Sequence, residues 1–234
     1  MDLEQELHTR LKTVREQIAA ACDACGRRPD EVTLLAASKA QSAEKIRILQ
    51  AAGLRDFGEN YANELLSKAG ELQGLDLTWH YIGHIQSNKI RRIVQVAATI
   101  QTVDNLRHAR QIERHALELG KSPYPVWVAV NIAGEKGKNG CAPADLPDLI
   151  RGLNDLPGLQ LRGLMAVPPR LDNPPTPEQL HHYKIIRKLA ETCGAGQLSL
   201  GMSADLGVAI AHGSTMVRIG RALLGERPPK PPAP

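Results

Sequence analysis

The chain has 234 residues, of which 42% are hydrophobic and 23% charged, so it is long enough to bury a sizeable core in one domain. Its formal charge of +4 is mildly basic, which suits a phosphate-bearing ligand. Aromatic residues make up only 3% of the chain, too few to stack nucleic-acid bases, so we expect no nucleic-acid partner. No apolar run approaches the ~20 residues that span a bilayer, and we therefore expect a cytoplasmic protein without a membrane partner.

Short runs rich in β-branched and apolar residues, bounded by Gly, Pro, Asn or Asp, predict eight strands. The predicted strands span residues 32–38, 54–59, 78–83, 99–104, 126–133, 159–167, 197–203 and 216–223. Helical patterns separate them, as at 42–53, 105–120 and 176–194, and an extra helix at 2–25 precedes the first strand. Because parallel neighbours need crossover connections, this alternation predicts an α/β fold, a single (β/α)₈ barrel domain over residues 1–227. A doubly wound open sheet is the alternative.

Two other features of the sequence predict no chemistry of their own. In the tail at 228–234 five of seven residues are proline, so we expect this segment to be disordered. Cys22 and Cys25 form a CxxC pair, but they fall at the end of the predicted helix 2–25. Thioredoxin-type thiols need a helix amino terminus, so we expect ordinary thiols and no metal site.

The first predicted strand ends on a lysine, in the run EVTLLAASKAQS at 31–42. Lys39 follows Leu35 and Ala37 in strand alternation, so if those two fill the barrel interior, Lys39 points to the same interior at its upper rim. A desolvated ammonium group there has a lowered pKa and can act as a nucleophilic amine. Taken alone, the residue is better explained as a strand-end lysine that reaches water, and the other strand ends decide between the two readings.

Those strand ends carry further polar residues, where barrels of this kind gather their chemistry. Arg218 interrupts an apolar run, and a buried guanidinium needs a carboxylate or a ligand acceptor to avoid a penalty of several kcal/mol. The small residues of LSLGMS at 198–203, and RIGRA with Gly220 and Arg221, fit the phosphate-binding turns after strands seven and eight. An amine, a phosphate cradle and a buried arginine together suit pyridoxal 5′-phosphate (PLP), held as a Schiff base on Lys39.

Several segments resemble, in order along the chain, the YggS/PROSC family of pyridoxal phosphate homeostasis proteins. They are ASK (37–39), FGENYANE (57–64), WHYIGHIQSNKIR (79–91), VNIAGEKGKNG (130–140), GLMAV (163–167) and LSLGMSADLGVAIAHGSTMVRIGRALLGER (198–227). The resemblance covers nearly the whole chain, and its last segment is highly specific.

The resemblance implies a single (β/α)₈ TIM barrel of the fold type III PLP class, like the barrel domain of alanine racemase. Lys39 would carry PLP, and Arg218 would lie at the pyridine nitrogen. Ser203 and the backbone around Gly220 and Arg221 would hold the phosphate. The implied cofactor-binding residues are Lys39, Asn60, His80, Met202, Ser203, Arg218, Gly220 and Arg221.

The sequence departs from the family pattern at a few positions. The family usually has Thr-Lys-Pro where Ala40, Gln41 and Ser42 stand here, which puts a role for a second lysine beside Lys39 in doubt. Leu224 replaces a usual phenylalanine and Leu200 a common methionine, both of which are conservative packing changes.

An arginine at the pyridine nitrogen can only donate, so it keeps that nitrogen unprotonated and makes the cofactor a weak electron sink. After the last predicted strand, residues 224–234 leave too little chain for a second domain that would supply a base. We therefore expect a monomeric PLP carrier or homeostasis factor rather than an enzyme. It would hand the cofactor to apo-enzymes and affect amino-acid and keto-acid metabolism indirectly.

Three alternatives remain open from the sequence. The main one is a PLP-dependent amino-acid racemase of low activity, for which Tyr61 is the first tyrosine to consider as a base. The second is a Schiff-base aldolase acting on a phosphorylated sugar. The third is a basic RNA-binding scaffold, which the lack of aromatic residues disfavours.

Overall fold

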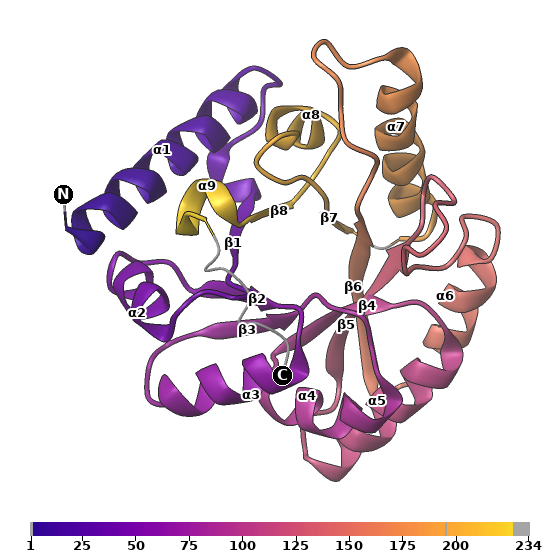
Figure 1. The fold of residues 1–234 in the computed structure, drawn as a ribbon. Helices are drawn as coiled ribbons and strands as arrows, with labels where there is room; N and C mark the ends of the chain where they lie inside the picture. Colours follow the sequence, from indigo (N-terminus) through magenta and orange to yellow (C-terminus); the bar gives the residue numbers. More distant parts are fainter. Residues whose placement is uncertain (1, 195, 227–234) are drawn as a thin grey trace.

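The computed structural model describes residues 2–194 and 196–226, and the tail expected to be disordered, 228–234, lies outside them. Within the described residues, eight parallel strands form a closed barrel in chain order, with β8 pairing back onto β1 (Figure 1). The strands are β1 Thr33–Ala37, β2 Asp56–Glu59, β3 Thr78–Tyr81, β4 Thr99–Val103, β5 Tyr124–Val130, β6 Leu159–Ala166, β7 Gln197–Ser199 and β8 Met216–Ile219. The predicted (β/α)₈ barrel is confirmed, and the open-sheet alternative is wrong.

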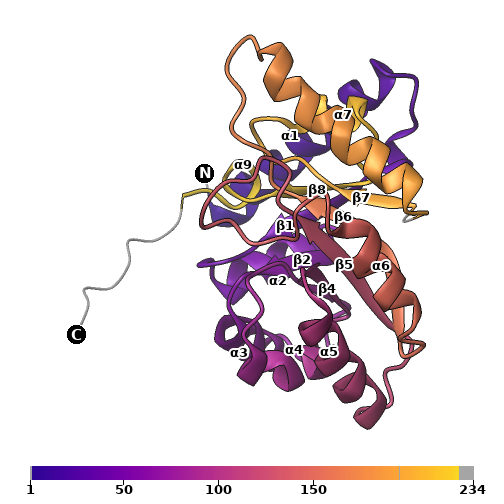
Figure 2. The same cartoon turned by 90° about the vertical axis from the view of Figure 1, so that its right-hand side faces the viewer.

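Helices cover the outside of this barrel (Figure 2). They are α1 Leu3–Asp23, α2 Ala43–Ala51, α3 Ala62–Glu71, α4 Ile90–Val96, α5 Leu106–Glu118, α6 Leu146–Asn154, α7 Pro177–Thr192, α8 Leu206–Ala211 and α9 Arg221–Leu224, with single 3₁₀ turns at Pro29–Glu31 and Ser87–Lys89. Side chains that accept from the first turn begin four of the helices: Asp2, Ser42, Asn105 and Thr176. Within the described residues, no helix is long and apolar enough to cross a membrane.

The extra amino-terminal helix belongs to the outer ring. The helix after β8, α9, has only 4 residues and is too short to cover its strand. The long helix α1 packs against α8, α2 and α9, and so fills this gap in the ring (Figure 1). Its buried stripe has helical spacing and is made of Leu7, Leu11, Val14, Ile18 and Cys22.

The core has two parts that follow from strand alternation. Residues such as Phe57 and Val217 face outward and join the large cluster between the sheet and the helices. Leu35, Trp127 and Met216 face inward and form a small apolar cluster inside the barrel. Leu35 thus faces inward as its alternation predicts, and the inward direction of Lys39 stays a prediction.

Several strands end earlier than the sequence predicts, at the rim of the barrel that is formed by their carboxyl ends. The last predicted strand, 216–223, stops at Ile219, because Gly220 turns the chain into α9. The predicted strand 197–203 stops at Ser199, and Gly201 follows with φ +98°, a left-handed conformation that favours glycine. These early ends place the predicted phosphate-binding residues in turns rather than in the sheet.

Candidate functional site

The carboxyl ends of all eight strands of the described barrel meet at one mouth, because the strands are parallel. Lys39 lies in the turn after β1, and Gly220 directly follows β8, which pairs with β1. A side chain on Gly220 would come within 3.5 Å of the Ala37 carbonyl oxygen, so these two strand ends nearly touch. Asn60 follows β2 on the other side of β1, and Ser203 follows β7 beside β8. The fold thus brings the predicted residues around one opening.

Arg218 is buried inside the barrel, as its alternation predicts. Its Nη1 donates to the Ser199 hydroxyl at 2.7 Å, and its Nη2 donates to the Ala166 carbonyl oxygen at 2.9 Å. Burial lowers the pKa of Arg218 to about 10, with Asp205 opposing the shift, so the guanidinium stays charged at neutral pH. It makes no ion pair with a carboxylate of the described residues, which leaves its charge available to a ligand.

His80 lies deeper than the mouth, in a chain of hydrogen bonds that crosses the barrel. The Ser199 hydroxyl donates to Gln101 Oε1 at 2.8 Å, and Gln101 Nε2 lies 2.8 Å from His80 Nδ1. An amide nitrogen only donates, so His80 Nδ1 must accept. His80 Nε2 then carries the hydrogen and donates to Asp56 at 2.9 Å. The chain runs in one direction, from Arg218 on β8 to the Asp56 carboxylate on β2.

The turn after β7 presents exposed small residues. The Met202 N–H donates to the Asp205 carboxylate at 2.7 Å, and the Tyr183 hydroxyl donates to the other carboxylate oxygen at 2.5 Å. Asp205 therefore fixes the turn from below. Met202 and Ser203 are both exposed, and the Ser203 hydroxyl has no hydrogen bond within the described part of the chain. That hydroxyl is free to bind an anion.

A cavity of about 270 Å³ opens over the ends of β2 to β6. Its lining includes Asn60, Ile82, Asn131, Lys138 and Met165. The Asn60 Oδ1 atom is buried and has no hydrogen-bond partner in the described structure, which is a costly arrangement unless a ligand donates to it. Gly83 packs closely against the backbone of Asn60, since a side chain on Gly83 would lie 1.8 Å from the Asn60 carbonyl oxygen.

The sequence did not identify several polar residues that the structure places at the site. They are Asp56, Glu64, Lys68, Gln101, Ser199 and Asp205. Gln101 and Ser199 carried a usable signal, because each interrupts an apolar strand in the same way as Arg218. Glu64 and Lys68 did not, because a Glu and a Lys four residues apart in a helix are typical of a solvated surface.

Among the described residues, no group of three or more His, Cys, Asp or Glu could hold a metal ion. Cys22 is buried and Cys25 exposed, and both are free thiols at the carboxyl end of α1. This agrees with the prediction that the CxxC pair lies at the wrong end of a helix for redox chemistry.

The chain was compared with known proteins. The family of alanine racemase N-terminal domains matches residues 10–228. The pyridoxal phosphate homeostasis protein of Pseudomonas aeruginosa is 45% identical over 219 residues, covering 92% of this chain and 93% of that protein. The Escherichia coli protein of the same name is 41% identical over 229 residues, covering 93% of this chain and 95% of that protein. The structure of PipY from Synechococcus elongatus with PLP bound superposes with a TM-score of 0.81 at 33% identity, covering 94% of this chain and all of that one.

These similarities span almost the whole chain and the whole of each relative. They confirm the resemblance drawn from the motifs at 37–39, 57–64 and 198–227. The chain belongs to the family of alanine racemase N-terminal domains and, within it, to the pyridoxal phosphate homeostasis proteins.

Proposed function

We propose that this protein binds PLP as a Schiff base on Lys39 and acts in carrying and buffering the cofactor. The observation on which this rests is that one mouth gathers a strand-end lysine, a charged arginine without a carboxylate partner among the described residues, and two turns of small residues. A relative of the same family is known with PLP bound, and others are named for PLP homeostasis.

The residues present fit this cofactor. The Ser203 hydroxyl has no hydrogen-bond partner among the described residues and is proposed to bind the phosphate, together with the backbone around Gly220 and Arg221, which begins α9 after the neighbouring strand. Asn60 offers an unpartnered oxygen in the cavity. Bound there, PLP would supply the aldehyde, and Lys39 would supply the amine that condenses with it as one water is released. His80 and Met202 complete the set of proposed neighbours.

Arg218 argues for storage rather than catalysis. Its guanidinium stays protonated and can only donate, so at a pyridine nitrogen it holds that nitrogen without a proton. A ring without that proton withdraws electrons weakly, which disfavours carbanion chemistry. We therefore propose a protein without robust catalytic activity, whose effect on amino-acid and keto-acid metabolism is indirect through the apo-enzymes that receive its cofactor.

Low racemase activity is the second candidate, because one tyrosine is placed for it. Tyr81, Tyr124 and Tyr183 are buried, and their hydroxyls donate to other groups of the protein. Tyr61 instead follows Asn60 at the mouth and is 62% exposed. Exchange of the alanine α-proton in deuterated water tests this candidate, and fast exchange that needs both Lys39 and Tyr61 would replace the carrier proposal.

The carrier proposal is tested with the parent and a Lys39→Ala variant. After incubation with PLP and removal of the excess, we expect visible absorbance in the parent only. The loaded parent should then restore activity to an apo-aminotransferase, used as acceptor, whereas the variant treated in the same way and added at equal concentration should not. A Lys39→Ala variant that keeps the colour and the affinity of the parent would overturn the proposal.

A further inference from the structure

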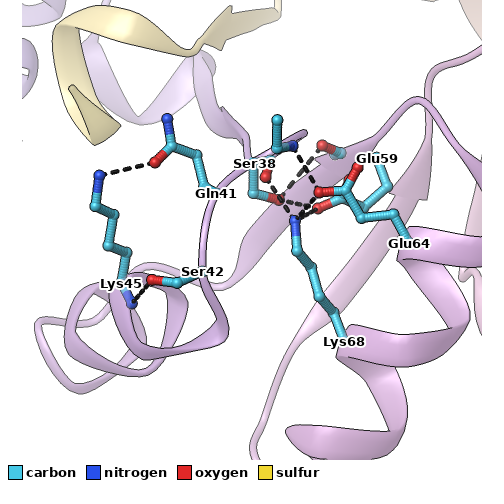
Figure 3. A network of polar contacts seen from close by, with 9 residues as sticks. Ser38, Gln41, Ser42, Lys45, Glu59, Glu64 and Lys68 are labelled. Carbon is cyan, nitrogen blue, oxygen red and sulfur yellow. Dashed lines mark hydrogen bonds and ion pairs between the residues drawn. The ribbon is translucent and has the colours of Figure 1, made fainter. Parts of the chain in front are cut away.

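A buried ion cluster lies beside the turn that carries Lys39, and it is formed by Lys68, Glu59 and Glu64 (Figure 3). The Lys68 ammonium on α3 donates to Glu59 Oε1 at 2.7 Å and to Glu64 Oε1 at 2.6 Å. Its third bond goes to the carbonyl oxygen of Ser38 at 2.7 Å. All three donors of this ammonium are therefore used within the protein.

The cluster holds the backbone on both sides of Lys39. Before Lys39, the Ser38 carbonyl oxygen accepts from Lys68, and the Ser38 hydroxyl donates to Glu59 Oε1 at 2.7 Å. After Lys39, the Ala40 N–H donates to Glu64 Oε1 at 2.6 Å. Ala40 has φ +57°, a left-handed conformation that a residue with a side chain rarely adopts. The Glu64 contact supports this unfavourable backbone.

The cluster lies on the outer face of the barrel, between β1, β2 and α3. Phe57 faces the helices, so Glu59, two residues on, faces them too, and its side chain reaches Lys68 of α3. Alternation gives Ser38 the same outward direction and Lys39 the inward one. The cluster therefore holds the turn from the outer face of the barrel, on the side away from the barrel interior.

Burying these charged side chains costs free energy, because they lose their hydration. The side chains of Lys68, Glu59 and Glu64 are 8%, 0% and 23% exposed. Glu59 Oε2 has no hydrogen-bond partner within the described residues, and burial raises the pKa of Glu59. An apolar filling of the same volume would stabilise the fold as well or better, but it could not bind the Ser38 carbonyl and the Ala40 N–H. The arrangement is explained by what it fixes.

We propose that Lys68, Glu59 and Glu64 are positioning residues for Lys39, which set the turn so that the Lys39 amine meets the PLP aldehyde at the mouth. This inference rests on the proposed attachment of PLP to Lys39. The turn is contacted from α3, through Lys68 and Glu64, and also from the segment that follows α9. The second contact is made by Gln41, which donates to the Gly225 carbonyl oxygen, just past the end of α9, at 3.3 Å.

The test compares Lys68→Met with Lys121→Met. Lys121 is a partly buried lysine that donates to the Gln95 carbonyl oxygen. It precedes the amino end of β5, whereas the mouth lies at the carboxyl ends of the strands. The rate of adduct formation is followed by absorbance after mixing with PLP, and thermal unfolding is measured beside it. We expect Lys68→Met to slow adduct formation by about tenfold or more, as a small misplacement of a reacting group does, and Lys121→Met to leave it unchanged.

A second pair of variants decides the question if Lys68→Met does not fold. Glu64→Gln keeps an oxygen that accepts from the Ala40 N–H, whereas Glu64→Ala removes it. We expect the rate of adduct formation to fall in Glu64→Ala and to recover most of the way in Glu64→Gln, even where both unfold at similar temperatures. A purely structural role would change the unfolding temperatures and leave the rate in folded protein equal across the pair.

The outcomes separate this inference from the proposed function. If the parent forms no adduct on Lys39, the proposed function fails first. If the parent forms it and Lys68→Met or Glu64→Ala forms it at the parental rate with parental PLP affinity, the positioning role is refuted while the proposed function stands.

Discussion

The two sides of the barrel mouth are formed by different kinds of chemical groups. The lysine side, formed by the ends of β1 and β2 with α3, is held by buried ionised side chains, Lys68 above all. The proposed phosphate side is formed by the turns after β7 and β8, where Gly201 turns the chain and the Asp205 carboxylate accepts from the Met202 N–H. A covalent bond needs one side chain in one place, whereas an anion is bound by several backbone N–H groups together. Each side suits its own task.

The interior of the barrel connects the two sides. Arg218 on β8 reaches Asp56 on β2 through Ser199, Gln101 and His80. This series of hydrogen bonds ends on the Asp56 carboxylate. It therefore links a negative charge to the Arg218 guanidinium, which has no direct ion pair within the described residues. Substitutions of residues that belong to only one side, or only to the interior, can therefore separate the contributions of these three regions.

The largest effect is expected from Gly83→Ala, next to the lysine side. The new side chain would lie 1.8 Å from the Asn60 carbonyl oxygen, a backbone atom that cannot move without moving the turn after β2. We expect a loss of about 3 kcal/mol in the free energy of unfolding, measured with urea. Gly70→Ala in α3 is the control, because nothing lies within 4 Å of its added carbon. Equal stability of the two variants would show that the turn is soft.

The next effect is expected in the interior, from Ser199→Ala. The substitution leaves an Arg218 donor and the Gln101 oxygen without their partner inside the barrel. We expect a loss of about 2 kcal/mol in the free energy of unfolding, as for other buried polar groups deprived of a partner. Denaturant titration measures it, and a variant as stable as the parent would mean that the hydrogen-bonded chain does not contribute to folding.

Ser203→Ala should show the opposite pattern on the phosphate side. Its hydroxyl is exposed and makes no hydrogen bond within the described residues, so the free energy of unfolding without ligand should not change. Loss of a hydrogen bond to a charged phosphate should weaken PLP binding about tenfold, measured by equilibrium dialysis. Unchanged affinity would place the phosphate elsewhere.

The smallest effect is a pH dependence of stability on the lysine side. The pKa of Glu59 is raised by burial, which outweighs the attraction of Lys68, so the folded protein binds this proton more readily than the unfolded chain. The contribution of Glu59 to stability is then fully present below the ordinary glutamate pKa of about 4.3 and is lost as the pH rises through the raised value.

Glu59→Gln removes this titration and serves as the reference. From thermal unfolding at a series of pH values, we expect the stability of the parent relative to Glu59→Gln to fall as the pH rises. A difference that grows with pH would mean that Lys68 dominates and that the pKa is lowered instead.

The sequence predicted the barrel and the burial of Arg218 well, because both depend on local patterns. Alternation around Leu35 and the polar break at Arg218 are visible in short windows of sequence. The ion cluster was missed for a physical reason: Lys68 meets Ser38 across 30 positions of the chain, and only the packing of α3 on β1 and β2 brings them together. The strand ends were set too late for a similar reason, since turns at Gly201 and Gly220 depend on tertiary contacts as well as on local preference.

Borohydride reduction of the PLP-loaded protein, followed by peptide mapping, tests the attachment most directly. Reduction adds hydride to the C=N bond and makes the link permanent. We expect a single pyridoxyl group on the peptide that contains Lys39. A label on another lysine, or no label on a protein that has kept its PLP, would contradict the assignment of Lys39 as the residue that holds the cofactor.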